Sequence, residues 1–146
     1  MGIEVRIRNT SNNALPQYAT AGSAGVDLCA AIDEPIPLQP FQRQLVPTGL
    51  FMEIPPGYEG QVRPRSGLAI NQGITCLNSP GTVDSDYRGE IKIILVNLSS
   101  EPQIVQPGQR IAQMVFCKVE TAFFNSVDAL TATQRGGGGF GHTGTH

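Results

Sequence analysis

Pro-Gly pairs interrupt this chain at three places, and no stretch between them repeats its apolar residues with the period of a helix. The intervening segments alternate apolar and polar residues or are rich in β-branched residues. The predicted strands cover residues 3–7, 44–54, 58–63, 74–78, 90–97 and 110–119. Many short strands separated by turns indicate an all-β sandwich or barrel.

Two short helices and a glycine-rich tail complete the prediction. Residues 66–72 can form one or two helical turns with Ser66 as the N-cap, because a serine hydroxyl can accept hydrogen bonds from unpaired N–H groups at a helix start. A second helix is predicted near residues 127–131. From Arg135 the sequence is mostly glycine and buries little, so we expect a flexible arm over residues 135–146 and a β domain over residues 1–134.

Length, charge and cysteine content limit the classes of protein to consider. A chain of 146 residues suits one domain, and no apolar run approaches the roughly 20 residues that span a bilayer. The first residues show no secretory signal, and the three widely spaced cysteines suit reduced thiols, so we expect a cytoplasmic protein. A net charge of -2 argues against broad electrostatic binding to nucleic acid.

The most informative stretch chemically is GTVDSDYRGEI, residues 81–91, which joins two predicted strands as a hairpin. It sets two carboxylates, a phenol and a guanidinium among backbone amides that a tight hairpin would hold rigid. Rigid amides can recognise the edge of a nucleobase, and a fixed carboxylate such as Asp84 can act on a water molecule. Taken alone, these residues also describe an acidic surface turn, because Asp and Gly are common in turns.

Four further segments, taken with this hairpin, carry a family resemblance. In chain order the five read AGVDLCA (24–30), PRSGLA (64–69), the hairpin, RIAQMVF (110–116) and RGGGGFGHTG (135–144). Their order and spacing resemble the five motifs of the trimeric dUTP pyrophosphatase (dUTPase) family. The resemblance implies a distorted jelly-roll, or β-clip, barrel that forms a homotrimer with shared active sites. It also implies Mg²⁺-dependent hydrolysis of dUTP to dUMP and pyrophosphate, which limits uracil entry into DNA and supplies dUMP for thymidylate synthesis.

The resemblance assigns the chemical step to two side chains. It implies that Asp84 activates or orients the water that attacks the α-phosphate and that Gln113 holds the same water. Without the resemblance, Gln113 would be an ordinary strand amide. Asp27 would act on Mg²⁺ through water, since this ion keeps water ligands and binds mainly through substrate phosphates. Arg110 would brace the site through ion pairs instead of touching the substrate.

The substrate contacts are also implied by the resemblance. The phosphates would lie against the start of the predicted helix, and Arg135 would arrive with the arm. The hairpin backbone would recognise uracil, Tyr87 would exclude a 2′-hydroxyl, and Phe140 would stack on the base with roughly 1–3 kcal/mol. Lys92 would contribute only its backbone. The expected contacts are Arg65, Ser66, Gly67, Asn78, Gly81, Thr82, Val83, Asp84, Tyr87, Lys92, Arg135, Phe140 and Gly141. His142 departs from the serine that is more usual in the family.

Two other interpretations stay open at this point. The related dCTP deaminases share the fold, but they use a glutamate to activate water at the base and contain more helix, which suits this sequence less well. A nucleotide-binding protein without catalytic activity would be expected to lack Asp84, Gln113 or the arm, and all three are present. Release of pyrophosphate instead of ammonia would distinguish the two enzymes.

Overall fold

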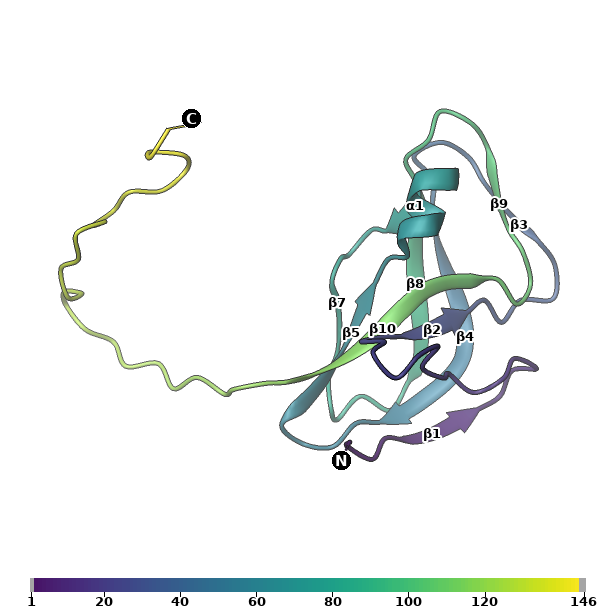
Figure 1. The fold of residues 1–146 in the computed structure, drawn as a ribbon, viewed down its shortest axis with the longest axis horizontal. Coiled ribbons are helices and arrows are strands. Elements are labelled where there is room, and N and C mark those ends of the chain that lie inside the picture. Colours follow the sequence, from purple (N-terminus) through teal and green to yellow (C-terminus); the bar gives the residue numbers. More distant parts are fainter. Residues whose placement is uncertain (1, 145–146) are drawn as a thin grey trace.

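The computed structural model describes residues 2–144 and consists mainly of two four-stranded antiparallel sheets (Figure 1). The first sheet has the order β1-β4-β8-β6, with β1 (Arg6–Asn9), β4 (Arg43–Glu53), β8 (Glu90–Asn97) and β6 (Ile74–Cys76). The second has the order β2-β10-β5-β7, with β2 (Val26–Cys29), β10 (Arg110–Lys118), β5 (Tyr58–Arg63) and β7 (Gly81–Val83). A separate pair joins β3 (Ile36–Leu38) to β9 (Gln103–Val105). The all-β class predicted from the sequence is confirmed.

A single apolar core lies between the two large sheets. Strands of both sheets contribute side chains that are at most 1% exposed, such as Leu28 and Met114 from one sheet and Ile93 and Leu95 from the other. Burial of an aliphatic side chain of this size contributes about 1.5–3 kcal/mol. The core therefore fixes the two sheets to each other, and the loops that carry the motif residues are held on a rigid frame.

One predicted helix is present and the other is wrong. α1 (Ser66–Gln72) has the expected bounds, but Arg65 occupies its N-cap without a side-chain cap hydrogen bond. The capping role predicted for Ser66 is wrong because the extended backbone continues to Arg65 (φ -102°, ψ 129°), so Ser66 already lies in the helix. Residues 127–131 form no helix and are exposed; so short a helix is marginal unless it packs on another element. Within residues 2–144, none of the helical structure could cross a bilayer.

The predicted hairpin is more complex than a single turn. β6 and β8 do pair, with Ile74 opposite Asn97 and Cys76 opposite Leu95. Their connection, however, contains β7, which crosses to the second sheet and pairs with β5. The loop that carries Asp84 is therefore held by both sheets.

The C-terminal segment leaves the barrel after β10 (Figure 1). The Val119 N–H donates to the Gly57 carbonyl at 2.9 Å, and every residue from 119 to 137 is exposed. The departure occurs well before Arg135, where the composition changes. The domain boundary between residues 134 and 135 stays a prediction.

Candidate active site

A first group of polar side chains forms where β2, β10 and the connection from β5 to α1 meet. β10 lies between β2 and β5, so Gln113 is opposite Asp27 on one side and Arg63 on the other. Residues directly opposite in neighbouring strands point to the same face. Gln113 Nε2 also donates to the Pro64 carbonyl at 3.0 Å. This bond ties β10 to the start of α1.

A β-bulge in β10 brings Arg110 to the same face. β10 gains one residue relative to β2 between Arg110 and Ala112, so Arg110 lies opposite Cys29 while Gln113 lies opposite Asp27. Cys29 and Asp27 share a face because they are two residues apart in a strand. Arg110 and Gln113 therefore share that face too, although a regular strand would turn them to opposite sides.

Asp27 joins two arginines in this group. Its Oδ1 accepts a hydrogen bond from Arg65 Nε at 2.8 Å, and its Oδ2 accepts one from Arg110 Nη1 at 3.3 Å. The ion pair expected of Arg110 is present, and its role in the site stays a prediction. The three side chains are partly exposed, so an anionic ligand can approach the arginines.

Two neighbours of Asp27 were not singled out from the sequence. A Cβ at Gly25 would lie 2.8 Å from Gln113 Oε1, so the glycine leaves space for that amide. Burial, and then the Asp27 carboxylate, raises the pKa of the Cys29 thiol, while Arg110 and Arg65 act in the opposite direction. Both residues lie in the AGVDLCA segment, but only a cross-strand register could reveal these contacts.

The donor set around Asp27 does not form a protein cage for a metal. Residues 2–144 contain no group of three or more His, Cys, Asp or Glu side chains that could hold an ion. Both Asp27 oxygens accept hydrogen bonds from arginines. Such a carboxylate suits Mg²⁺ only as an outer acceptor for its water ligands, with the ion held mainly by phosphate oxygens.

A second group of predicted residues lies on the loop that contains β7. Gly81 and Val83 are buried, whereas Thr82 and Asp84 are exposed. A Cβ at Gly81 would lie 3.3 Å from Asn78 Nδ2, so the absence of a side chain lets the Asn78 amide approach the backbone of β7. Thr82 and the Asp84 carboxylate are thus open to solvent on a short stretch of main chain beside the Asn78 amide.

Tyr87 closes this loop onto β8. Its N–H donates to the Asp84 carbonyl at 3.2 Å, and its hydroxyl donates to the Glu90 carbonyl at 2.9 Å. The side chain is 45% exposed, so Tyr87 is a wall of the loop and not part of the core. Lys92 is exposed, with Nζ 3.6 Å from Glu90 Oε2.

The two groups lie near opposite ends of β5. Val83 pairs with Gly60, which puts Asp84 level with Glu59, whereas the Gln113 amide contacts Pro64 beyond the other end of the strand. Five residues of extended chain span about 16 Å. Two groups that hold one water molecule lie within roughly 6 Å of each other. The structure of one chain therefore does not bring Asp84 and Gln113 together.

Comparison with known proteins decides the family, because the dUTPase family model matches residues 11–144. The chain belongs to the dUTPase family. It is 61% identical to the deoxyuridine 5′-triphosphate nucleotidohydrolase of Cytophaga hutchinsonii, over 99% of this chain and 94% of that protein. The nucleotidohydrolase of Sinorhizobium medicae is 57% identical, over 96% of this chain and 89% of that protein. The resemblance found in the five segments is thus confirmed.

Solved dUTPase structures share the fold. A mutant dUTPase of Staphylococcus bacteriophage 80alpha, solved with dUpNHpp, has a TM-score of 0.84 at 22% identity and covers 97% of this chain and 99% of its own. A mutant from phage phi11 of S. aureus, with a structural Mg(II) ion, has a TM-score of 0.80 at 20% identity and covers 89% of this chain and 100% of its own. The distorted jelly-roll predicted for the family is therefore the fold of this chain.

The third group of predicted residues, on the fifth motif, lies away from the barrel (Figure 1). Arg135 Nε donates to the carbonyl of Gly138 at 2.7 Å, within the segment itself. Phe140 is fully exposed, with a positive φ of 52°, and the following Gly141 has a φ of 82°. The imidazole of His142 packs over Gly138. Within one chain, this motif contacts neither of the other two groups.

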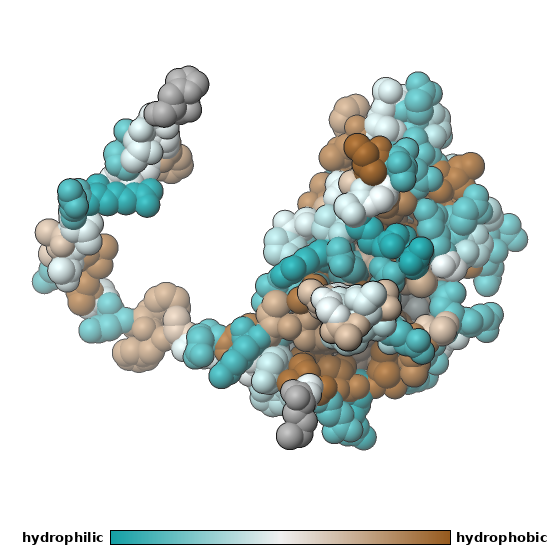
Figure 2. Space-filling model, in the orientation of Figure 1, coloured by the Kyte–Doolittle hydropathy of each residue, from teal (hydrophilic) through white to brown (hydrophobic). Residues whose placement is uncertain are grey.

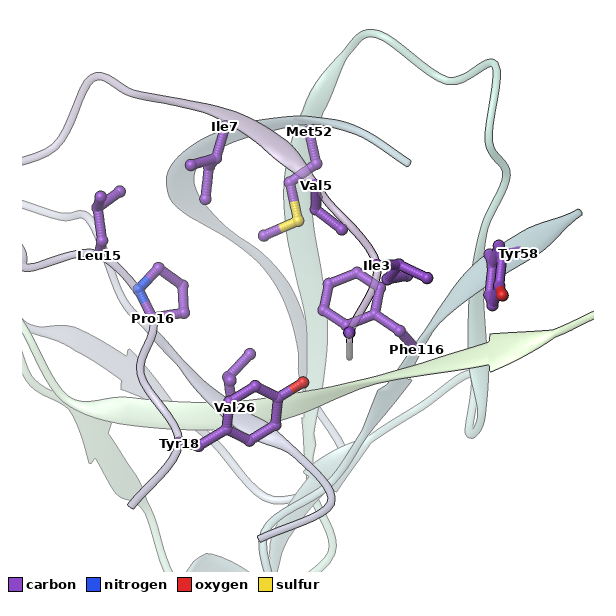
Figure 3. A pocket seen from close by; sticks show the side chains of 11 residues that line it. Ile3, Val5, Ile7, Leu15, Pro16, Tyr18, Val26, Met52, Tyr58 and Phe116 are labelled. Carbon is purple, nitrogen blue, oxygen red and sulfur yellow. The ribbon is translucent and has the colours of Figure 1, made fainter. Parts of the chain in front are cut away.

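An apolar pocket of about 620 Å³ lies beside the N-terminal strand, and none of the predicted site residues lines it (Figure 3). Its walls are Gly2, Ile3, Val5, Ile7, Leu15, Pro16, Tyr18, Val26, Met52, Tyr58 and Phe116. Figure 2 shows apolar surface around this end of the barrel and again along the C-terminal segment. That segment exposes Phe123 (93%), Phe124 (90%) and Leu130 (89%). A chain in isolation thus leaves two apolar surfaces uncovered.

Proposed function

We propose that this chain is a cytoplasmic dUTP diphosphatase that releases dUMP and pyrophosphate. Membership of the dUTPase family over nearly the whole chain carries this proposal. The reaction keeps uracil out of DNA and provides dUMP for thymidylate synthesis. The exposed Asp84, on a loop held by both sheets, is the group that supports hydrolysis over simple binding.

The chemical step is attack of water on the α-phosphate. Asp84 accepts the proton of that water or orients it, and Gln113 holds the same water from the other side. Phosphoryl transfer depends mainly on positioning and charge neutralisation, so fixed donors and a single acid suffice. Arg65, Ser66 and Gly67 lie exposed or half-exposed at the start of α1, where they can contact the phosphates. Mg²⁺, when bound with the triphosphate, neutralises phosphate charge, with Asp27 as an acceptor for its water.

The loop from Asn78 to Tyr87 selects the nucleoside. The backbone of Gly81, Thr82 and Val83, with the Asn78 amide, matches the donors and acceptors of uracil. Cytosine would leave these groups unpaired. Unpaired polar groups that a bound ligand shields from water greatly weaken its binding. The Tyr87 ring, fixed by its bond to the Glu90 carbonyl, fills the space of a 2′-hydroxyl. Phe140, Gly141 and Arg135 close over the bound nucleotide.

The separation of Asp84 from Gln113 supports a homotrimer with shared sites. Since about 16 Å of strand separates the two groups in one chain, the single water that they hold must lie between different copies. The first group of one copy then faces the hairpin loop of another. The arm can come from a third copy, because the segment that carries it already extends away from its own barrel.

The apolar surfaces support the same assembly. We expect residues 119–130 of one copy to lie in the N-terminal pocket of another. Strand β1 is at the edge of its sheet, and residues 3, 5 and 7 turn partly buried apolar side chains toward this pocket. An extended segment can add to such an edge through backbone hydrogen bonds while its alternate side chains fill the pocket. Large exposed apolar patches of this kind mark protein interfaces.

The proposed activity is tested by a pyrophosphate-release assay over dUTP, dTTP, dCTP and UTP with Mg²⁺. We expect turnover of dUTP alone and no release of ammonia from dCTP. Asp84→Asn should slow hydrolysis of dUTP by at least about 100-fold, the scale of a lost general base, while dUpNHpp still binds. The matched control is Asp33→Asn, the same change on an exposed loop carboxylate.

Two outcomes would contradict this proposal. Equal turnover of dCTP, or release of ammonia, would remove the selectivity assigned to the hairpin loop. Hydrolysis by Asp84→Asn at the rate of the Asp33→Asn control would remove Asp84 from the chemical step.

A further inference from the structure

We propose that Asp27 has a task that does not depend on metal: it positions Arg65 and Arg110 as a pair of guanidinium groups that grips the substrate phosphates. The inference rests on the proposed function, because it concerns the same site. It makes Asp27 a positioning residue, which acts on the ligand through two arginines. A carboxylate that only accepts hydrogen bonds from the water ligands of Mg²⁺ would not act on the substrate through the arginines.

The hydrogen-bond geometry leaves the arginines able to bind an anion. Asp27 accepts a hydrogen bond from Arg65 Nε at 2.8 Å, and neither Nη group of Arg65 donates to an acceptor within residues 2–144. Arg110 gives Asp27 only Nη1, at 3.3 Å. Within residues 2–144, no other acceptor engages either guanidinium. A guanidinium carries five N–H donors in a fork that fits phosphate oxygens, so most of these donors are available to a ligand.

Charge explains why a carboxylate is needed between the two arginines. Two guanidinium groups within reach of one side chain repel each other, and the shared carboxylate offsets this repulsion. The three groups together keep a net charge of +1, which favours an anionic ligand. The side chains of Arg65, Asp27 and Arg110 are 27%, 32% and 61% exposed, so a triphosphate can reach them.

The backbone around the cluster is fixed independently of Asp27. The Gln113 amide bonds to the Pro64 carbonyl, which anchors the residue before Arg65. Pairing of β2 with β10 fixes Arg110 opposite Cys29. Asp27 therefore controls the directions of the two arginine side chains and not the positions of their main chains. Its replacement should leave the fold intact and change the phosphate grip.

Binding without metal separates the two tasks of Asp27. We would titrate dUpNHpp in EDTA by calorimetry into the assembled wild-type protein and into Asp27→Asn. We expect Asp27→Asn to weaken this metal-free binding by at least about fivefold, a typical coupling for groups in one network. Asp27→Glu, which restores the carboxylate, should recover most of the loss, and Asp33→Asn should bind like wild type. Unchanged or tighter binding by Asp27→Asn in EDTA would overturn the proposal.

A double-mutant cycle tests whether Asp27 acts through the arginines. In an Arg65→Ala, Arg110→Ala background, we expect Asp27→Asn to have no further effect on metal-free binding of dUpNHpp. An unchanged fivefold effect in that background would show that Asp27 acts by another route and would also overturn the proposal. Failure of the proposed function looks different, because wild-type protein would then release no pyrophosphate from dUTP with Mg²⁺, whether or not it binds dUpNHpp.

Discussion

Gly89 lies beneath the ring of Tyr87, and this contact sets where the ring can stand. Any Cβ at residue 89 would collide with the ring and with its hydroxyl. The colliding atoms belong to the outer part of a half-exposed side chain that the core does not hold. A substitution at Gly89 should therefore move the ring and leave the barrel unchanged. The absence of a side chain at Gly89 therefore fixes the place of the ring, on which the proposed contact with the sugar depends.

Gly89→Ala is predicted to reduce the selectivity for deoxyribose at little cost in stability. The displaced ring would no longer exclude a 2′-hydroxyl, so kcat/KM for UTP relative to dUTP should rise by about tenfold or more, the effect of one lost steric contact. Steady-state assays with both nucleotides measure this ratio, and thermal unfolding checks the fold. Gly22→Ala is the matched control, because a Cβ at that glycine would meet nothing within 4 Å. An unchanged ratio in Gly89→Ala would show that Tyr87 does not border the sugar.

At the level of elements, two turns of the barrel have the same hydrogen-bond pattern. After β1, the Thr10 N–H donates to the carbonyl of Gly49 at 2.8 Å, and after β8 the Leu98 N–H donates to that of Gly73, also at 2.8 Å. In each case an asparagine at the strand end accepts from a serine two residues later. Both glycines have positive φ and face that serine closely. The two turns fix the ends of the first sheet in the same way.

Gly73→Ala is predicted to destabilise the protein by about 2–3 kcal/mol. Its φ of 64° is unfavourable for alanine, and a Cβ would lie 2.8 Å from that of Ser99, so strain and a steric clash add. Urea unfolding measures the loss. Gly57→Ala provides the control, since its φ is 84° but a Cβ there meets nothing within 4 Å. Equal losses in the two variants would mean that the contact with Ser99 contributes nothing.

The sequence predicted those elements whose signal is local. Alternation and turn residues located β4, β5, β8 and β10 to within about a residue at each end. β7 was not predicted, because its three residues are a strand only through their pairing with β5. The bulge in β10 could not be predicted either. Ile111 and Ala112 are consecutive apolar residues, and such a pair also occurs in a regular strand that is buried on both faces. The motif segments predicted which residues belong to the site, but they could not show that Asp27 bridges two arginines.

At the scale of the whole molecule, a single chain leaves two apolar surfaces uncovered. Phe123 and Phe124 are about nine-tenths exposed on a segment without a partner, while an apolar pocket stands open at the other end of the same chain. Burial of each such side chain would contribute about 1.5–3 kcal/mol. Assembly should therefore depend on the stretch that precedes the arm, and catalysis on the arm itself.

Phe123→Ser with Phe124→Ser is predicted to shift the protein from oligomer to monomer and to abolish most turnover. Light scattering after size-exclusion chromatography measures the mass. Phe140→Ser, a similar change on the arm, is the control and should keep the mass of the oligomer while it weakens dUpNHpp binding. If the double variant kept the wild-type mass, residues 119–130 would not form the interface.

The distance between the hairpin loop and the arginine cluster has a genetic consequence under the shared-site arrangement. A copy damaged at Asp84 and another damaged at Arg65 each retain an intact half of the machinery. In a mixed oligomer, the intact arginine cluster of one copy would face the intact hairpin loop of the other and form a complete site. Two alleles that are inactive separately would therefore complement each other in one cell.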